Sequence, residues 1–348
     1  MLGESTFSLS GTNKPNGGAN GRNSGSREAS DRGARRHLEG DIEAAKAEYV
    51  SALELDPQNA TAHNNLGFLL AQEGKFDEAM AHYRRALEIE PAKSMAMANM
   101  GIVQVAQGND GEGLDWLRRA VESNPANLLA WDNLSRLLLK LGRLTEAEAA
   151  ARTALEQAPH EGRIYLTLGL AVAGQQRIRE AVEILRRAVE LDPDSATGWE
   201  QLGVVLWLRQ DLGSAVDALR RALSLSPKSA SARYQLAMVL LTRGEHEEAA
   251  QELHTVLAID PAHTAAQLDL AVLAISQGHS SDALNRLEVV LHAEPENPRA
   301  LFYRAVALDH LQRNREATEL LQGLADAGMG KYSERARRYL QERGGTIV

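Results

Sequence analysis

Small and apolar residues recur along most of the chain with a period of 34 residues. The prolines show the period most plainly, because eight of the ten are separated by steps of 34, at Pro57, Pro91, Pro125, Pro159, Pro193, Pro227, Pro261 and Pro295. If each unit ends two residues after its proline, the proline is position 32 and nine units run from Ser26 to Lys331. This regularity predicts an array of similar structural units.

Two positions of every unit hold only small residues. Position 8 is Gly, Ala or Ser from Gly33 to Ala305, and position 20 is Ala or Gly from Ala45 to Ala317. Two helices can approach closely only where neither carries a bulky side chain, so these positions predict a tight crossing of two helices in each unit.

Glycine and proline indicate where the helices of a unit end. Position 15 is Gly in six units, from Gly40 to Gly278, which predicts that the first helix ends there in a left-handed turn. The second helix is expected over about positions 18 to 31, where the proline stops it. No strand pattern is evident, so the predicted fold class is all-α.

These residues together resemble the tetratricopeptide repeat (TPR). The likeness rests on the 34-residue period and on the proline at position 32. It also rests on a bulky residue at position 4, such as Trp131; on Leu-Gly at positions 7 and 8, as in Leu66–Gly67; on Ala at position 20; and on an aromatic residue at position 24, as in Tyr49 and Tyr83. The resemblance implies a right-handed α-solenoid, a superhelix in which neighbouring units bury each other's apolar faces. The expected repeats are 26–59, 60–93, 94–127, 128–161, 162–195, 196–229, 230–263, 264–297 and 298–331.

The two ends of the chain depart from the pattern. Residues 1–25 are rich in Gly, Ser and Asn and are expected to form a disordered tail, since they bury too little apolar surface to offset the entropy of ordering. The first helix of repeat 1 carries Arg32 and Arg36 and is expected to be a polar cap or frayed. Within 332–348, a capping helix over 333–343 is predicted by an apolar stripe at helical spacing, made of Tyr332, Ala336, Tyr339 and Leu340.

Composition excludes several classes of function. The chain has no cysteine, which excludes disulfides, thiolate metal sites and a cysteine nucleophile. Its net charge of −9 makes nucleic acid an unfavourable partner. The chain contains no run of 18 apolar residues, so no membrane-spanning helix is predicted. The N-terminus shows no apolar h-region of a secretory signal peptide, so a cytoplasmic location is expected. A monomer is expected, with a homo-oligomer left open.

No motif for catalysis, a cofactor or a metal is evident. His246-Glu247-Glu248 begins like a zinc-protease motif but lacks the second histidine. The glycine-rich stretch 17–21 lacks the Lys-Ser/Thr of a phosphate loop. We therefore expect no enzyme, cofactor or metal site. Twin arginines at positions 25–26 are interpreted as a solvated outer face, neutralised by pairs four residues apart such as Arg118–Glu122 and Arg186–Glu190.

A polar column at position 6 is the first candidate site. It contains Asn65, Asn99, Asn133, Thr167, Gln201, Gln235 and Asp269. Asn and Gln amides offer a donor and an acceptor together, which matches a peptide bond. The column is similar to the asparagine ladder in the superhelix of peptide O-GlcNAc transferases, and this resemblance implies a clamp on an extended peptide backbone. The alternative is that these side chains only bond neighbouring helices.

An apolar column on the same face is the second candidate. At position 9 it includes Phe68, Ile102, Met238 and, as an exception, Arg136; Trp207 and Tyr234 add aromatic side chains at positions 12 and 5. In TPR arrays this face lines the concave groove, so the resemblance assigns these residues a binding role. Trp and Tyr anchor many interfaces, and Met adapts to varied partners.

The sequence therefore predicts a non-catalytic scaffold that binds protein segments in its TPR groove. Two alternatives stay open: a substrate-recruiting subunit of a glycosyltransferase system, and a structural scaffold that self-assembles through its ends. Charged end residues such as Arg32 and Arg304 argue against the latter. No repeat has Lys at position 5 with Asn at position 9, so recognition of the C-termini of heat-shock chaperones is not expected.

Overall fold

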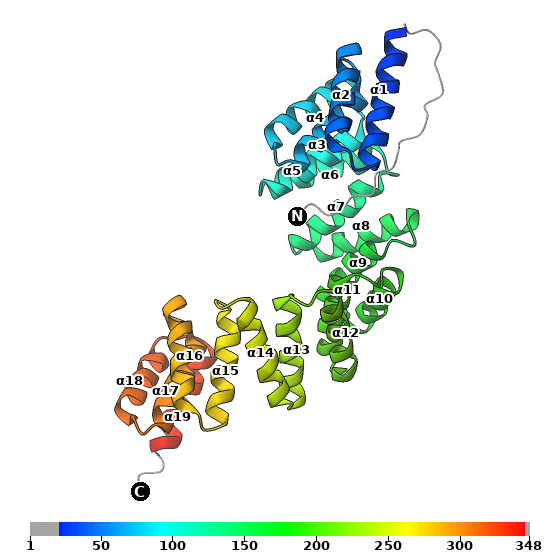
Figure 1. The fold of residues 1–348 in the computed structure, drawn as a ribbon. Helices are drawn as coiled ribbons and strands as arrows, with labels where there is room; N and C mark the ends of the chain where they lie inside the picture. Colours follow the sequence, from blue (N-terminus) through cyan, green and yellow to red (C-terminus); the bar gives the residue numbers. More distant parts are fainter. Residues whose placement is uncertain (1–20, 345–348) are drawn as a thin grey trace. The chain divides into compact units, whose positions relative to one another are not determined.

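The computed structural model describes residues 21–344, which form nineteen α-helices and no β-strand (Figure 1). These helices belong to two compact units, which are divided in the sequence between Asp192 and Pro193. Within the described range, no helix combines the length and the apolar character that crossing a bilayer requires. The predicted all-α fold of paired helix–turn–helix repeats that form a solenoid is confirmed.

The first unit contains five helix pairs. Their first helices are α1 (Gly21–Leu38), α3 (Ala60–Gln72), α5 (Ser94–Ala106), α7 (Leu128–Lys140) and α9 (Gly162–Gly174). Their second helices are α2 (Ile42–Leu55), α4 (Phe76–Ile89), α6 (Asp110–Ser123), α8 (Leu144–Gln157) and α10 (Ile178–Leu191).

The second unit contains four helix pairs and a last single helix. The first helices are α11 (Ala196–Leu208), α13 (Ala230–Arg243), α15 (Thr264–Ser276) and α17 (Pro298–His310). The second helices are α12 (Leu212–Leu225), α14 (His246–Ile259), α16 (Ser280–Ala293) and α18 (Asn314–Asp326), and the chain continues into α19 (Lys331–Gly344).

Polar side chains at position 34 start most of the first helices. Asn59 accepts a hydrogen bond from the backbone N–H of Ala62 at 2.9 Å, and Asn127 accepts one from Ala130 at 3.1 Å. Such caps satisfy N–H groups that the start of a helix leaves unpaired. The second helices begin at position 17 and, except for α18, end at position 30, one residue earlier at each end than predicted.

Helix pairs cross closely at the small residues, as predicted. A Cβ atom on Gly67 would lie 2.9 Å from a ring carbon of Tyr83 and 3.1 Å from the carbonyl oxygen of Ala79. Between α5 and α6, a Cβ on Gly101 would lie 3.0 Å from the carbonyl oxygen of Gly113. Any larger side chain at these positions would push the two helices apart.

The left-handed turn after the first helix is also confirmed. The six glycines at position 15 have φ angles from 71° to 85°. The other three repeats adopt the same conformation without glycine, with φ of 64°, 65° and 64° at Gln176, Gln210 and Gln312. The geometry of the repeat therefore sets this backbone conformation even where the residue does not favour it.

The first helix extends further toward the N-terminus than predicted. The expected disordered tail ended at residue 25, but α1 begins at Gly21; residues 1–20 of that tail lie outside the described range. Small side chains explain the extension, because they let α1 pack on α2. Ser26 is fully buried and donates to the backbone oxygen of Ala52 at 2.7 Å, and Ala29 is fully buried as well. The helix is thus a polar cap that packs through small residues.

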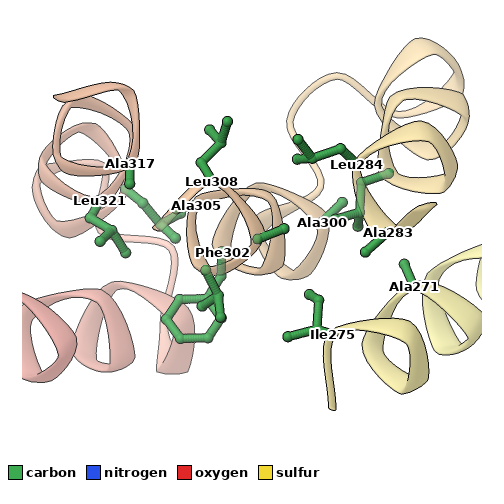
Figure 2. Packing of buried hydrophobic residues seen from close by; sticks show 14 of the residues in the cluster. Ala271, Ile275, Ala283, Leu284, Ala300, Phe302, Ala305, Leu308, Ala317 and Leu321 are labelled. Atoms are coloured by element: carbon green, nitrogen blue, oxygen red, sulfur yellow. The ribbon is translucent and has the colours of Figure 1, made fainter. Parts of the chain in front are cut away.

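The last helix covers the final helix pair through the predicted stripe. Tyr332 and Ala336 are buried, and Tyr339 and Leu340 are partly buried against the same cluster. Figure 2 shows how small residues bring the neighbouring helices together: Ala300 of α17 faces Ala283 of α16, and Ala305 faces Ala317 of α18. Phe302 extends from α17 toward α19, and its ring centroid lies 6.0 Å from that of Tyr332.

The ion pairs of the outer face differ from those predicted. Arg118 pairs with Glu146 of the next repeat, at 3.0 Å, and not with Glu122. Arg186 pairs with Glu183 on its own helix, at 3.4 Å, and not with Glu190. Neighbouring repeats bring other carboxylates within reach, so helical spacing alone does not select the partner. All four side chains are well exposed, so each pair contributes little stability.

Candidate binding face

The predicted site residues lie on one side of the first helices. We call this the first-helix face and define it as positions 2, 5, 6, 9, 12 and 13 of repeats 2 to 9, which lie away from the positions that pack on the second helix. The helices that carry it are poor in charge: α3 and α5 contain no charged residue, whereas α6 and α10 contain six each. Charge is therefore concentrated on the second helices.

In the first unit, the asparagines of the predicted ladder are bonded within the chain. Asn99 is buried, and its Nδ2 donates to Asn64 Oδ1 at 3.0 Å. Asn64 donates in turn to Asn65 Oδ1 at 3.0 Å. Asn133 is half-buried and donates to the backbone oxygen of Leu129 at 2.8 Å. The structure thus brings Asn65 and Asn99 together through Asn64, and it holds Asn133 on its own helix.

The apolar column of the first unit is half-buried and has one interruption. Phe68 on α3 and Ile102 on α5 are each partly exposed, and the ring of Phe68 lies 5.7 Å from that of His37 on α1. Arg136, at the equivalent position of α7, is exposed and places a positive charge there. The apolar surface therefore extends over α3 and α5 and is interrupted at α7.

A buried carboxylate lies beside this interruption. Asp132 on α7 is 2% exposed, and its Oδ2 lies 3.6 Å from Nε of Arg163 on α9. Burial raises the pKa of Asp132, against the opposing effect of the positive charges on Arg163 and Arg136. Because Arg163 neutralises Asp132, the pair adds little net charge to the first-helix face.

In the second unit, the polar column has a different character. Gln201 on α11 and Gln235 on α13 are half-buried, and neither side chain makes a hydrogen bond to any residue in 21–344. Asp269, one repeat further on, is 3% exposed, accepts a hydrogen bond from Tyr234 Oη at 2.8 Å, and pairs with Arg299 at 2.5 Å. The amides of Gln201 and Gln235 are therefore available to bond a partner, and the carboxylate of Asp269 is not.

The aromatic candidates of the second unit are fixed in position by neighbouring residues. Trp207 is half-buried, and its Nε1 donates to Thr242 Oγ1 on α13 at 3.2 Å. The ring of Tyr234 lies 4.9 Å from that of His263. Met238, on the same helix as Tyr234, is half-buried. These side chains present apolar surface on α11 and α13.

The buried ion pairs between first helices were not predicted. In both cases an acidic residue at position 5 or 6 is followed by an arginine at position 2 of the next repeat, as in Asp132–Arg163 and Asp269–Arg299. An alignment of the nine repeats contains this signal. It becomes recognisable only when residues are compared between neighbouring repeats and not within one helix.

The histidines include one close pair. His63 on α3 and His82 on α4 face each other with their Nδ1 atoms 2.9 Å apart, and burial lowers the pKa of both. Among residues 21–344, no three His, Asp or Glu side chains are grouped as a metal site would require. The pair links the two helices of repeat 2.

Five protein-family models match parts of the chain. Four describe tetratricopeptide repeats and match residues 33–74, 60–92, 98–162 and 138–202. The fifth is described as the TPR domain of cytochrome c-type biogenesis protein H and matches residues 173–301. No curated protein sequence matches the chain. None of these findings supports the predicted likeness to peptide O-GlcNAc transferase.

Solved structures share the fold at low sequence identity. The Cut9–Hcn1 hetero-tetramer of the APC/C is similar over 78% of this chain and 54% of that chain, with a TM-score of 0.61 and 19% identity. PilF of Pseudomonas aeruginosa is similar over 58% and 92%, with a TM-score of 0.53 and 19% identity. A tetratricopeptide repeat protein of Parabacteroides merdae is similar over 68% and 94%, with a TM-score of 0.52 and 18% identity.

Proposed function

We propose that this chain, which is a tetratricopeptide repeat protein, is a non-catalytic scaffold that binds segments of other proteins along its first-helix face. The observation that carries the proposal is the contrast between the two sets of helices. Apolar side chains such as Ile102 and Met238 are partly exposed on helices that carry little charge, whereas the second helices carry most of the charge. Repeated, partly exposed apolar positions are what a protein-binding surface offers.

Site-specific photocrosslinking tests this proposal. In the test variants, a photoreactive phenylalanine analogue replaces Ile102 or Met238 on the first-helix face. In the matched controls, the same analogue replaces the exposed Glu122 or Gln251 on a second helix. In extract from the source cells, the first-helix variants should form crosslinks to discrete proteins and the controls should not. Equal crosslinking from both faces, or none from the first-helix face, would contradict the proposal.

A second candidate is a role in the assembly of c-type cytochromes. It is favoured by the match of residues 173–301 to the TPR domain of cytochrome c-type biogenesis protein H. The chain has no cysteine, so in such a pathway it would hold a polypeptide and could not exchange thiols with it. The partner would be a cytochrome chain before its haem is attached.

Calorimetry with two forms of one cytochrome c distinguishes this candidate. The haem-free chain, with its cysteines alkylated, should bind the full-length protein, and the folded haem-containing form should bind at least tenfold more weakly. Equal affinity for both forms, or binding of neither, would contradict a role in cytochrome assembly. The general scaffold function would then depend on the crosslinking result alone.

A further inference from the structure

We propose that the first-helix face of α11, α13 and α15 takes an extended, uncharged protein segment with apolar side chains. This inference rests on the proposed scaffold function and assigns the chemistry of the partner. Three properties of these helices support it: three of their four charged residues are ion-paired, two of their amide groups are unbonded, and their apolar side chains are partly exposed.

Every charged residue on the three helices already has a partner within the chain. Arg233 pairs with Glu252, Arg243 with Glu245, and Asp269 with Arg299 and Tyr234. Glu200 accepts a hydrogen bond from the Ser231 hydroxyl and keeps its negative charge. A charged residue of the partner would lose hydration against this face. On these three helices only the half-buried Glu200 could offer it an opposite charge, and 500 mM salt screens that interaction. An uncharged segment would not incur that cost.

The two glutamines match a peptide backbone. Gln201 and Gln235 occupy equivalent positions of neighbouring repeats, and neither amide is bonded within residues 21–344. Each amide can donate to a carbonyl and accept from an N–H of the partner. Packed helices lie about 8–10 Å apart, and an extended chain advances about 3.3 Å per residue, so the two glutamines would meet peptide groups about three residues apart.

Partly exposed apolar side chains flank the glutamines. Val204 and Trp207 lie on α11, Met238 and Leu241 on α13, and Val272 on α15. The hydrogen bond from Trp207 to Thr242 orients the indole ring before a partner binds, so less side-chain freedom is lost on binding. These residues would receive the apolar side chains of the segment.

Three labelled 12-residue peptides test the inference by fluorescence anisotropy on the full chain. The neutral probe alternates Leu or Val with Ser or Gln; the other two replace the polar residues with Glu or with Lys. At 500 mM NaCl the neutral probe should bind at least tenfold more tightly than either charged probe. Its Kd should change by less than about twofold between 50 and 500 mM NaCl, because no ion pair contributes.

A pair of variants tests the role of the glutamines. Gln201→Ala with Gln235→Ala should weaken binding of the neutral probe by about fivefold to a hundredfold, as expected for the loss of two to four hydrogen bonds. The control Gln251→Ala, on the exposed side of α14, should leave the Kd unchanged. Alanine favours helix, so both variants should keep the circular-dichroism melting curve of the wild type.

The outcomes separate this inference from the proposed function. Equal or tighter binding of a charged probe, or an unchanged Kd in the double variant, overturns the inference. If no probe binds while the photoreactive analogue at position 238 still crosslinks to a protein, the inference is overturned and the scaffold function stands. If neither probe nor crosslink is found, both are wrong.

Discussion

At the scale of single residues, the turn after each first helix shows how the repeat constrains its sequence. All nine residues at position 15 have positive φ, but three of them are glutamine. A side chain in this left-handed region costs about 1 kcal/mol relative to glycine, so Gln176, Gln210 and Gln312 are local strains that the packed helices on either side maintain. The six glycines avoid that cost.

Two substitutions at the turn should differ in their effect on stability. Gly142→Ala should lower the free energy of unfolding by about 1 kcal/mol, because φ is 71° there and a Cβ atom would contact nothing, which leaves only the backbone cost. Gln176→Gly should be neutral or slightly stabilising. Urea unfolding followed by circular dichroism gives the sign of each change; a shift of the same sign in both would contradict the account.

The bonded asparagines lead to a second prediction at this scale. Asn99→Ala should destabilise the first unit by about 1–3 kcal/mol, because it leaves the buried Asn64 Oδ1 without its donor. Gln235→Ala, at the equivalent position of α13, should change stability little, since that side chain makes no hydrogen bond within residues 21–344. Thermal melts compare the two, and equal melting temperatures would show that the Asn99–Asn64 bond contributes nothing.

At the scale of elements, polar contacts between repeats supplement the packing of helix pairs. Glu148 on α8 shows this best: it accepts hydrogen bonds from Arg152 on its own helix, Gln175 at the end of α9, and Arg177 before α10. Burial raises its pKa, but these three donors outweigh that effect and lower the pKa to about 2. One carboxylate therefore joins two successive repeats.

The shifted pKa predicts how this contact depends on pH. Because the pKa of Glu148 falls from an ordinary 4.5 to about 2 in the folded chain, its stabilising effect is complete above pH 4.5 and is lost as the pH falls toward 2. Glu148→Gln should therefore lower the urea midpoint at pH 7 and differ progressively less from the wild type between pH 4.5 and 2. Glu122→Gln, on the exposed side of α6, is the control at each pH. A difference that does not depend on pH would contradict the assignment.

Overpacking tests the helix crossing directly. Ala147 on α8 is fully buried, and Ser135 is the small residue at position 8 of the same repeat. Ala147→Leu should therefore cost about 1–3 kcal/mol of stability, whereas Glu122→Ala on an exposed surface should change it little. Equal melting temperatures for the two variants would mean that the assigned register is wrong.

The elements were predictable because their signals are local and repeated nine times. Proline, glycine and the small crossing residues each have a direct effect on backbone or packing, so the positions of the helices followed from the sequence. The contacts of the site did not. Whether Asn99 faces a partner or Asn64, and whether Arg118 reaches Glu122 or Glu146, depends on the distance between neighbouring repeats, which no single helix encodes. The start of α1 was missed because glycine and serine favour disorder unless a neighbouring helix accepts them.

At the scale of the whole molecule, charge is concentrated on the second helices of repeats 2 to 9. The net charge is −9, yet the helices of the first-helix face carry few charged residues, and three of the four on α11, α13 and α15 are ion-paired within the chain. The charged side chains of the second helices are mostly solvated, while partly exposed apolar side chains such as Ile102 and Met238 lie on first helices with few charges. Both units share this arrangement, so a partner is expected to cover the first helices and leave the second helices open to solvent.

Thiol footprinting of a complex shows which helices a partner covers, because the chain has no cysteine of its own and every introduced one is unique. Single variants Ile102→Cys and Met238→Cys report on the first-helix face, and Glu122→Cys and Gln251→Cys report on second helices. The rate of maleimide labelling is measured with and without a saturating amount of a partner protein that the photocrosslinking experiment has identified. We predict at least fivefold slower labelling at one or both first-helix positions and less than twofold change on the second helices. Protection confined to the second helices would contradict the account.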